Sequence, residues 1–441
     1  MSFLRSLLVL VAALALADCG GDGGSGGIAA PPPVAVAPGP APAKVLNVAT
    51  VTLDAGPAAL ASGGNGSGAF NEPYVTITIC APGSTTNCQT IDHVILDTGS
   101  VGLRLIRGAL NASVLAALPA ETDASSNPVG ECYQYVNSYA FGSVRKVDFA
   151  IAGESVASMP LQVIADTGVF GTVPASCSSG GGTNITTVQE FGANGVIGIG
   201  TTTTDCGARC TTAGGSAGAI YYDCPSGGCS AVIARGANVA APFEQLPNPV
   251  AAFAVDNNGT ILALPAVPPR GAPALSGTVT FGIGTQANNA LNAATLLPVT
   301  RSDSRLGAGV LTVTYLGKQL TQSFVDSGSN EYFFIDTGLT PCTNNNYLAF
   351  YCPNGAVTIA FVLTATNGAT ASEAFSLNSP LTIAGSSVVA PGLAINPTLV
   401  KPPLPFANSF DLGLPFFFGR TIYTAIEGRQ AGATAGPYIA Y

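Results

Sequence analysis

The sequence lacks residue types that several kinds of active site require. It contains no tryptophan, one histidine and two methionines, and only 9% of its 441 residues are charged. A Ser-His-Asp triad would have to pass through the single histidine, His93, and zinc sites built from several histidines are excluded by count. Strand alternation places His93, Ile95 and Asp97 on one face. We therefore interpret His93 as a strand-end residue that packs beside a loop.

The charge balance argues against a nucleic-acid partner. Lys and Arg total 15 against 24 Asp and Glu, which gives a formal net charge of −9 at pH 7, whereas nucleic-acid binding needs a basic surface. The chain is rich in glycine (54) and proline (32), and 47% of its residues are hydrophobic. This composition predicts an all-β globular protein with many turns, because a disordered chain would carry more charge and fewer apolar residues.

The first 19 residues have the pattern of an export signal. Arg5 supplies a positive charge, and the apolar stretch 7–17 that follows is too short to span a bilayer. No later window is both long and apolar enough to cross a membrane. We therefore predict an exported protein with a signal peptide at residues 1–19.

Two cleavage sites compete within this signal. Small residues at 15 and 17 fit ordinary signal peptidase cleavage before Asp18, which would give a secreted protein. Residues 16–19, Leu-Ala-Asp-Cys, resemble a bacterial lipobox in which Cys19 is lipidated. The Gly-, Pro- and Ala-rich segment 20–44 is then a tether. We favour a lipid-anchored protein in the periplasm or on the outer membrane of a Gram-negative bacterium.

The cysteines support export. The chain has 11, and removing Cys19 leaves ten, an even number that predicts five disulfides in an oxidising compartment. Spacing predicts the pairs Cys80–Cys88, Cys342–Cys352 and Cys132–Cys177. The remaining four have no pairing order that the sequence reveals, and they also fit a Cys₄ zinc site, although the export signal favours disulfides; they are Cys206, Cys210, Cys224 and Cys229.

One short motif occurs twice. Residues 94–100 read Val-Ile-Leu-Asp-Thr-Gly-Ser and residues 323–329 read Ser-Phe-Val-Asp-Ser-Gly-Ser. An alternating strand and a turn precede each copy, with the strands at 74–79 and 311–316. The repeat therefore covers a hairpin as well as the motif, which gives it more weight than a short match alone.

The aspartates of the two motifs suggest a shared chemistry. A carboxylate at the end of a buried strand needs hydrogen bonds, which the flanking hydroxyls can donate. If Asp97 and Asp326 met, the two like charges would share one proton and provide one acid and one base. Two more Asp-Thr-Gly tripeptides, at 166–168 and 336–338, lack a hydroxyl in the fourth position, and we interpret both as turns.

These motifs resemble those of the pepsin-like aspartic proteases, and the chain resembles an uncharacterised group of exported proteobacterial proteins of that fold. Each of the family's two similar β lobes supplies an apolar-Asp-Thr/Ser-Gly-Ser/Thr loop, beside which a later apolar-apolar-Gly strand lies. Residues 195–200 and 415–420 match the later strand, with Gly198 and Gly419 as the glycines. The resemblance implies a bilobal pepsin-like fold, in which two pseudo-twofold-related β lobes enclose a central cleft.

The repeated order of elements sets the expected domains. The N-terminal lobe, with the Asp97 loop, is expected at 45–249, and the C-terminal lobe, with the Asp326 loop, at 250–441. The Pro- and Gly-rich segment 256–276 is the expected crossover between the lobes.

The resemblance also implies roles for individual residues. Asp97 and Asp326 would be the catalytic dyad, in which one aspartate activates a water as general base while the other, protonated, polarises the scissile carbonyl. The dyad-supporting residues would hold the two loops together and orient the carboxylates; they are Thr98, Gly99, Ser100, Ser327, Gly328 and Ser329.

The family also closes its cleft with a hairpin flap that carries a tyrosine. Tyr139 and Phe141, in the sequence Tyr-Ala-Phe-Gly-Ser, are the candidates for this role. The family's tryptophan near the first loop has no counterpart, because this chain has no tryptophan.

We therefore expect a monomeric, exported aspartic endopeptidase that hydrolyses a peptide or protein substrate. It would use no metal and no other cofactor, and it would contact a membrane only through a lipid on Cys19. One alternative is a catalytically silent cell-envelope binding protein on the same fold. A second alternative is a disulfide-stabilised envelope protein without a functional cleft.

Overall fold

Strands make up nearly all of the regular structure in the computed structural model. The model describes residues 46–61, 69–207, 210, 220–231, 244–301, 307–344, 347–400, 404 and 406–441. The predictions of a signal peptide, a lipobox at Cys19 and a tether concern residues 1–44 and lie outside the described residues.

The prediction of an all-β protein is confirmed. The described α-helices have six residues or fewer: α1 (Ala58–Ala61), α2 (Ala112–Ala117), α3 (Ala175–Ser178) and α4 (Val188–Phe191). Short 3₁₀ turns occur at Arg107–Ala109, Gly168–Gly171, Pro380–Thr382 and Leu414–Phe417. Within the described ranges, no helix has the length and apolar character that a bilayer crossing requires.

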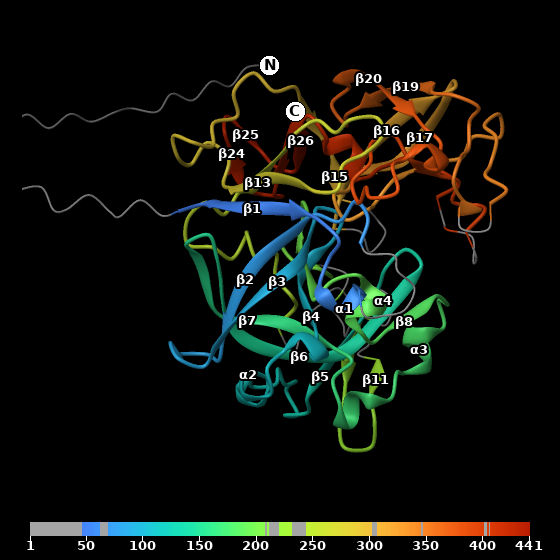
Figure 1. The fold of residues 1–441 in the computed structure, drawn as a ribbon. Coiled ribbons are helices and arrows are strands. Elements are labelled where there is room, and N and C mark those ends of the chain that lie inside the picture. The colour runs from blue at the N-terminus through green and yellow to red at the C-terminus, as the bar shows by residue number, and fades with distance from the viewer. Residues whose placement is uncertain are drawn as a thin grey trace, which may run out of the picture. The chain divides into compact units, whose positions relative to one another are not determined.

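The described strands form two large sheets and one small pair. Figure 1 labels many of these strands. The 16-stranded sheet has the order β11-β10-β5-β6-β7-β4-β9-β3-β2-β1-β13-β12-β23-β26-β14, and β8 pairs with β6. Its strands, in chain order, are β1 (Val48–Leu53), β2 (Tyr74–Cys80), β3 (Cys88–Asp97), β4 (Val101–Ile106), β5 (Val129–Gln134), β6 (Ser138–Ile151), β7 (Glu154–Ile164), β8 (Thr183–Ile185), β9 (Gly195–Ile199), β10 (Tyr221–Asp223), β11 (Ser230–Ala231), β12 (Gly259–Leu264), β13 (Leu275–Phe281), β14 (Leu296–Pro298), β23 (Arg420–Ala425) and β26 (Tyr438–Ala440).

The second sheet contains eight of the described strands in the order β20-β19-β16-β17-β22-β18-β21, and β15 pairs with β16. These strands are β15 (Thr300–Arg301), β16 (Gly309–Tyr315), β17 (Lys318–Val325), β18 (Tyr332–Phe333), β19 (Val357–Thr364), β20 (Thr370–Leu377), β21 (Ala394–Ile395) and β22 (Asp411–Leu412). A small separate pair joins β24 (Gln430–Ala431) and β25 (Thr434–Ala435).

The two predicted hairpins are present. β2 pairs antiparallel with β3, and β16 pairs antiparallel with β17, so each Asp-bearing strand is the second strand of a hairpin. The alternating side chains of β2 and β16 explain this placement: Ile77, Ile79 and Val313 point into one buried core, while threonines lie between them.

The segment expected to be a crossover contains a strand. Residues 256–276 include β12, which pairs with β13 and with the C-terminal strand β23. β1 also pairs with β13, so the larger sheet contains strands from both sides of residue 249. The lobe boundaries at 45–249 and 250–441 therefore stay predictions.

The ten described cysteines form five disulfides. The three pairs expected from spacing, Cys80–Cys88, Cys132–Cys177 and Cys342–Cys352, are confirmed. The remaining cysteines pair as Cys206–Cys210 and Cys224–Cys229, so the Cys₄ zinc alternative does not hold. Five disulfides indicate a chain that folds outside the cytoplasm.

Candidate active site

Each Asp loop is held by a parallel strand that returns beside it. Asp97 ends β3, which pairs with β9 in a register that places Gly198 opposite Asp97. A Cβ on Gly198 would lie 2.6 Å from the carbonyl carbon of Ser100, so only glycine fits there. In the second half, β17 pairs parallel with β22, and Asp326 donates its backbone N–H to Leu412 O at 3.0 Å.

The prediction that residues 415–420 form the second return strand is wrong. β22 takes that place, and Gly413 directly follows it, in the position that Gly198 holds in the first half. Gly419 instead lies at a positive φ of 77° before β23, and its N–H donates to Leu264 O. The sequence misled because Phe417-Phe418-Gly419 fits the apolar-apolar-Gly pattern. Asp411, the first residue of β22, breaks that pattern.

The two loops hold each other through a reciprocal set of hydrogen bonds. Thr98 N–H donates to Ser327 Oγ at 3.0 Å, and Ser327 N–H donates to Thr98 Oγ1 at 2.9 Å. Each hydroxyl in turn donates to a carbonyl of the strand before the opposite loop: Ser327 Oγ to Leu96 O at 2.7 Å, and Thr98 Oγ1 to Val325 O at 3.4 Å. These buried bonds fix the position of one loop against the other.

The glycines of the motif allow the carboxyl groups to approach the opposite loop. A Cβ on Gly328 would lie 2.6 Å from Cγ of Asp97, and a Cβ on Gly99 would collide in the same way with the Asp326 carboxyl. The backbone N–H groups of the same glycines donate to the carboxylates, Gly99 to Asp97 Oδ1 at 2.6 Å and Gly328 to Asp326 Oδ1 at 2.7 Å. The structure thus brings Asp97 and Asp326 face to face.

The two outer serines are not equivalent. Ser100 Oγ donates to Asp97 Oδ2. Ser329 Oγ lies 3.0 Å from Asp326 Oδ2 and also 2.7 Å from Oδ2 of Asp411. Sequence reasoning missed Asp411, because an acidic residue was not expected in a return strand.

The environment of the pair favours one protonated carboxyl. Burial raises the pKa of Asp326 well above its ordinary value, and Asp97, which lies within hydrogen-bonding reach, and Asp411 raise it further. The side chains of Asp97 and Asp326 are only 8% and 7% exposed. We infer that Asp326 carries a proton at acidic and mildly acidic pH and offers it as an acid.

Two more acidic side chains lie close to this site. Burial raises the pKa of Glu331 from 4.5 to about 8. Burial also raises the pKa of Glu72 from 4.5 to about 8, against the opposing hydrogen bond from Asn330, whose Nδ2 donates to Glu72 Oε1 at 2.7 Å. Both residues are therefore neutral at mildly acidic pH.

These raised pKa values make the folded protein more stable at acidic pH. Between pH 4.5 and about 8 the folded chain keeps protons on Glu72 and Glu331 that the unfolded chain has released. Stability from these groups is therefore complete below pH 4.5 and is lost as the pH rises, by up to about 1.4 kcal/mol per pH unit for each group. We expect the free energy of unfolding, measured by urea denaturation, to fall by about 3 kcal/mol or more from pH 5 to pH 8.

Two variants test whether the raised pKa values cause this loss of stability. Glu331→Gln is neutral at every pH and should reduce the dependence of the free energy of unfolding on pH. Glu190→Gln should leave it unchanged, because the pKa of Glu190 is lowered from 4.5, mainly by hydrogen bonds from Thr186 and Thr187 that outweigh its burial. Stability that rises from pH 5 to pH 8 in the wild type would contradict the prediction.

A cavity of about 670 Å³ opens beside the pair. Asp97 and Asp326 both line it, together with aromatic and aliphatic side chains and the tip of the β5–β6 hairpin. The aromatic residues that line it are Tyr133, Tyr135, Phe324, Phe333 and Phe406. The surface of the cavity is thus mostly apolar, and Asp97 and Asp326 are its acidic residues.

The β5–β6 hairpin lines the cavity, but with rings other than the two expected. Tyr133 and Tyr135 line the cavity, whereas Phe141 packs against Tyr222 at 5.5 Å between ring centroids in a buried cluster. Tyr139 packs at the edge of the same cluster. The alternation of Cys132-Tyr133-Gln134-Tyr135 before the turn was the available signal for the correct rings.

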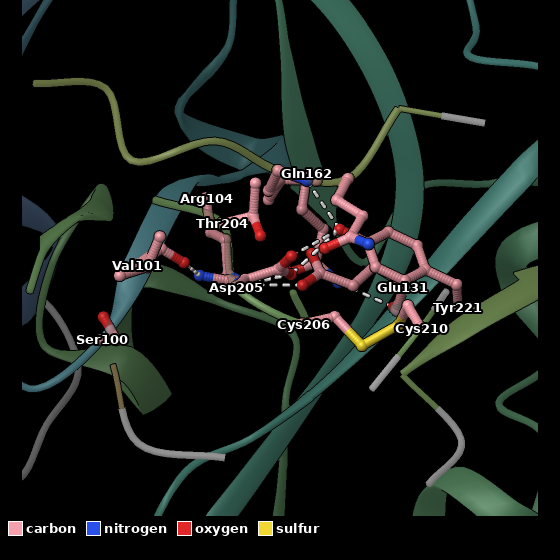
Figure 2. A network of polar contacts seen from close by, with 12 residues as sticks. Ser100, Val101, Arg104, Glu131, Gln162, Thr204, Asp205, Cys206, Cys210 and Tyr221 are labelled. Atoms are coloured by element: carbon pink, nitrogen blue, oxygen red, sulfur yellow. Dashed lines mark hydrogen bonds and ion pairs between the residues drawn. A yellow bond between two sulfur atoms is a disulfide. The ribbon is translucent and has the colours of Figure 1, made fainter. Parts of the chain in front are cut away.

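A buried ionic network joins β4 to the hairpin strand β5 (Figure 2). Arg104 on β4 is fully buried, and its Nη2 donates to Glu131 Oε1 on β5 at 2.6 Å and to Asp205 Oδ2 at 3.3 Å. Tyr221 OH lies 2.9 Å from Asp205 Oδ1. The guanidinium also lies over the Tyr133 ring, 3.7 Å from its centroid. Arg104 therefore connects the strand after the Asp97 loop with the hairpin that lines the cavity.

Two buried carboxyls share the single guanidinium of this network. Burial raises the pKa of Asp205 well above its ordinary value, and Glu131 raises it further. Burial alone would lower the pKa of Arg104, but Glu131 raises it overall. The shorter of the two carboxylate contacts of Arg104, to Glu131 at 2.6 Å, is the main buried ion pair of the network.

The other candidate groups have structural contacts. Asp166 forms an ion pair with Arg145 at 2.7 Å, and Asp336 accepts a hydrogen bond from Tyr315 OH at 2.6 Å. His93 packs edge-on against Tyr74 at 5.0 Å and contacts Asp54 at 3.2 Å. Among the described residues, no group of three or more His, Cys, Asp or Glu side chains is placed to hold a metal ion.

Comparisons with known proteins give one family and one fold. Residues 43–441 match a family described as protein of unknown function (DUF3443). No curated protein matches the chain. Among solved structures, the crystal structure of aspartic proteinase from Irpex lacteus is similar, with 12% sequence identity and a TM-score of 0.47 over 89% of this chain and 96% of that chain.

Proposed function

The chain belongs to the DUF3443 family, and we propose that it is an exported aspartic endopeptidase. The observation that carries this proposal is the mutual holding of the two Asp loops, which brings Asp97 and Asp326 together at the wall of one cavity. Two buried carboxyls in that arrangement provide an acid and a base without a metal or another cofactor.

The proposed mechanism assigns a different role to each aspartate. Ionised Asp97 accepts a proton from a water held between the carboxyls, while protonated Asp326 gives its proton to the scissile carbonyl oxygen. Water oxygen bonds to the carbonyl carbon and a neutral tetrahedral diol forms. The diol then returns a proton to Asp326 as its C–N bond breaks, and the proton on Asp97 passes to the leaving amine. The raised pKa of Asp326 supports this assignment.

The cavity suits a peptide with apolar side chains. Its exposed surface is mainly apolar, and Tyr133 and Tyr135 of the β5–β6 hairpin line it together with the two carboxyls. A hairpin that closes on a bound peptide would exclude bulk water and strengthen the electrostatic interactions at the reacting atoms. We propose a peptide or protein substrate, no nucleic-acid partner and a monomeric enzyme.

The proposed location is the periplasm or the outer membrane of a Gram-negative bacterium, with a lipid on Cys19 as the membrane contact. The five disulfides support an oxidising compartment. The intact mass of the mature protein separates the lipidated form, which begins at Cys19, from the secreted alternative, which begins at Asp18.

A digestion experiment tests the activity. We expect the purified protein to cleave members of a peptide library between pH 3 and pH 6 and to lose activity toward neutral pH, where the shared proton is released. A peptide with a tetrahedral hydroxyl in place of the scissile carbonyl should raise the melting temperature and inhibit cleavage. Absence of cleavage at every pH would contradict the proposal. Stabilisation by the peptide without cleavage would instead favour the silent binding protein.

A further inference from the structure

The two halves of the site differ at one buried side chain. In the register of the return strands, Asp411 pairs with Phe324 two positions before Asp326, as Val196 pairs with Ile95 two positions before Asp97. Val196 is a buried apolar residue, whereas Asp411 is a fully buried carboxyl. The second half therefore has an acidic group where the first half has a hydrocarbon.

The hydroxyl of Ser329 connects this carboxyl to Asp326. Its Oγ lies 2.7 Å from Asp411 Oδ2 and 3.0 Å from Asp326 Oδ2. A hydroxyl has one proton to donate, so it can serve only one ionised carboxylate. The other carboxyl must therefore be protonated and donate its proton to Ser329 Oγ. Ser100, the counterpart of Ser329, donates to Asp97.

The surroundings of Asp411 do not neutralise its charge. The groups that act on it electrostatically are Asp326 at the end of β17, Asp97 at the end of β3, and Glu331 just before β18. In the part of the chain that the structure describes, none of these groups is a Lys, Arg or His, and Asp411 Oδ1 has no hydrogen-bond partner. Burial raises the pKa of Asp411 well above its ordinary value, the hydrogen bond from Ser329 opposes this rise, and Asp97 and Glu331 add to it. Once Asp411 is ionised, its charge acts on the pair without a nearby cation.

We propose that Asp411 is a positioning residue that acts through Ser329 and keeps the proton shared by Asp97 and Asp326 on Asp326. When Asp411 is ionised, Ser329 donates to it, and Asp326 faces the lone pairs of Ser329 Oγ and retains a proton. When Asp411 is absent, Ser329 donates to Asp326 as Ser100 does to Asp97, and ionised Asp326 is stabilised. The catalytic consequence rests on the proposed endopeptidase function, but the position of the proton does not.

The titration of Asp326 tests this role directly. The variant Asp411→Val copies Val196, the residue of the first half, and Asp411→Asn preserves the shape if the valine variant fails to fold. Aspartate labelled with ¹³C at the carboxyl carbon reports each titration by NMR, and the resonance that disappears in Asp326→Asn identifies Asp326. We expect the apparent pKa of Asp326 to fall by about one unit or more in both variants.

The control is Asp336→Asn, which removes a carboxyl from the same half of the chain outside the site and should leave the titration of Asp326 in place. If the wild type cleaves peptides, the alkaline limb of its pH–rate profile should move to lower pH in Asp411→Val by the same amount, which a packing role would not cause. An unchanged Asp326 titration in a folded Asp411 variant overturns the inference. A shifted titration in a protein that cleaves nothing supports the role of Asp411 and rejects the endopeptidase.

Discussion

Replacement of Asp97 or Asp326 by asparagine is expected to reduce the rate of peptide cleavage by about 10³-fold or more. Asparagine keeps the size of the side chain but can neither accept the proton of the attacking water nor give one to the carbonyl oxygen. Each variant removes one of the two roles, so we expect similar losses from both. The measurement is kcat/KM on a peptide identified in the library digestion, at the pH optimum of the wild type.

Thermal unfolding of the same variants distinguishes a loss of catalysis from a loss of folding. Both variants should unfold at or above the wild-type temperature at pH 7, because they remove a buried carboxyl from a site that already contains Asp411 and Glu331. Asp336→Asn, in one of the two additional Asp-Thr-Gly tripeptides, should retain wild-type activity. Cleavage that survives either substitution in the pair would exclude the two-aspartate mechanism.

Replacement of Arg104 by methionine should lower the free energy of unfolding by about 3–5 kcal/mol. Arg104 and Glu131 are both fully buried, and their ion pair at 2.6 Å is one cation against one anion. Methionine leaves Glu131 as a buried charge without its partner and also removes the guanidinium from the Tyr133 ring. Urea denaturation with the disulfides intact measures the loss.

A second substitution separates charge from packing. In Arg104→Met combined with Glu131→Gln, the uncompensated charge is gone, and we expect the double variant to recover a large part of the lost stability. Arg107→Met is the matched control: Arg107 lies three positions away with a 43% exposed side chain and a long 3.6 Å contact to Asp166. Its loss should cost no more than about 1 kcal/mol. A loss from Arg104→Met as small as that of Arg107→Met would contradict the assigned role.

The sequence was sufficient for the elements that depend on local pattern. The two hairpins, the Asp loops and three of the disulfides follow from alternation, repetition and spacing, and the structure contains all of them. The predicted pairing of the Asp97 loop with the strand that contains Gly198 is also confirmed. This strand could be predicted because β9 has the apolar sequence of a strand buried on both faces.

The predictions that failed concern elements whose position depends on tertiary pairing. β22 is only two residues long and begins with an aspartate, so no periodic signal marks it as a return strand. The neighbouring Phe417-Phe418-Gly419 had the better local pattern but occupies a 3₁₀ turn and a left-handed glycine instead. Arg104 gave no signal, because nothing in the sequence shows that a single arginine on an apolar strand will meet Glu131 and Asp205 in a buried network.

The reciprocal bonds between Thr98 and Ser327 have a consequence for the order of events during folding. They join residues 229 positions apart in the chain. Contacts between residues so far apart in the sequence form late and slowly. Closing a long loop costs entropy before the contacts that compensate for this cost exist. Neither loop alone can place the two carboxyls, so the pair assembles only after both hairpins have formed and docked. A chain that has not finished folding therefore has no assembled pair, and the proposed hydrolysis would begin only after folding is complete.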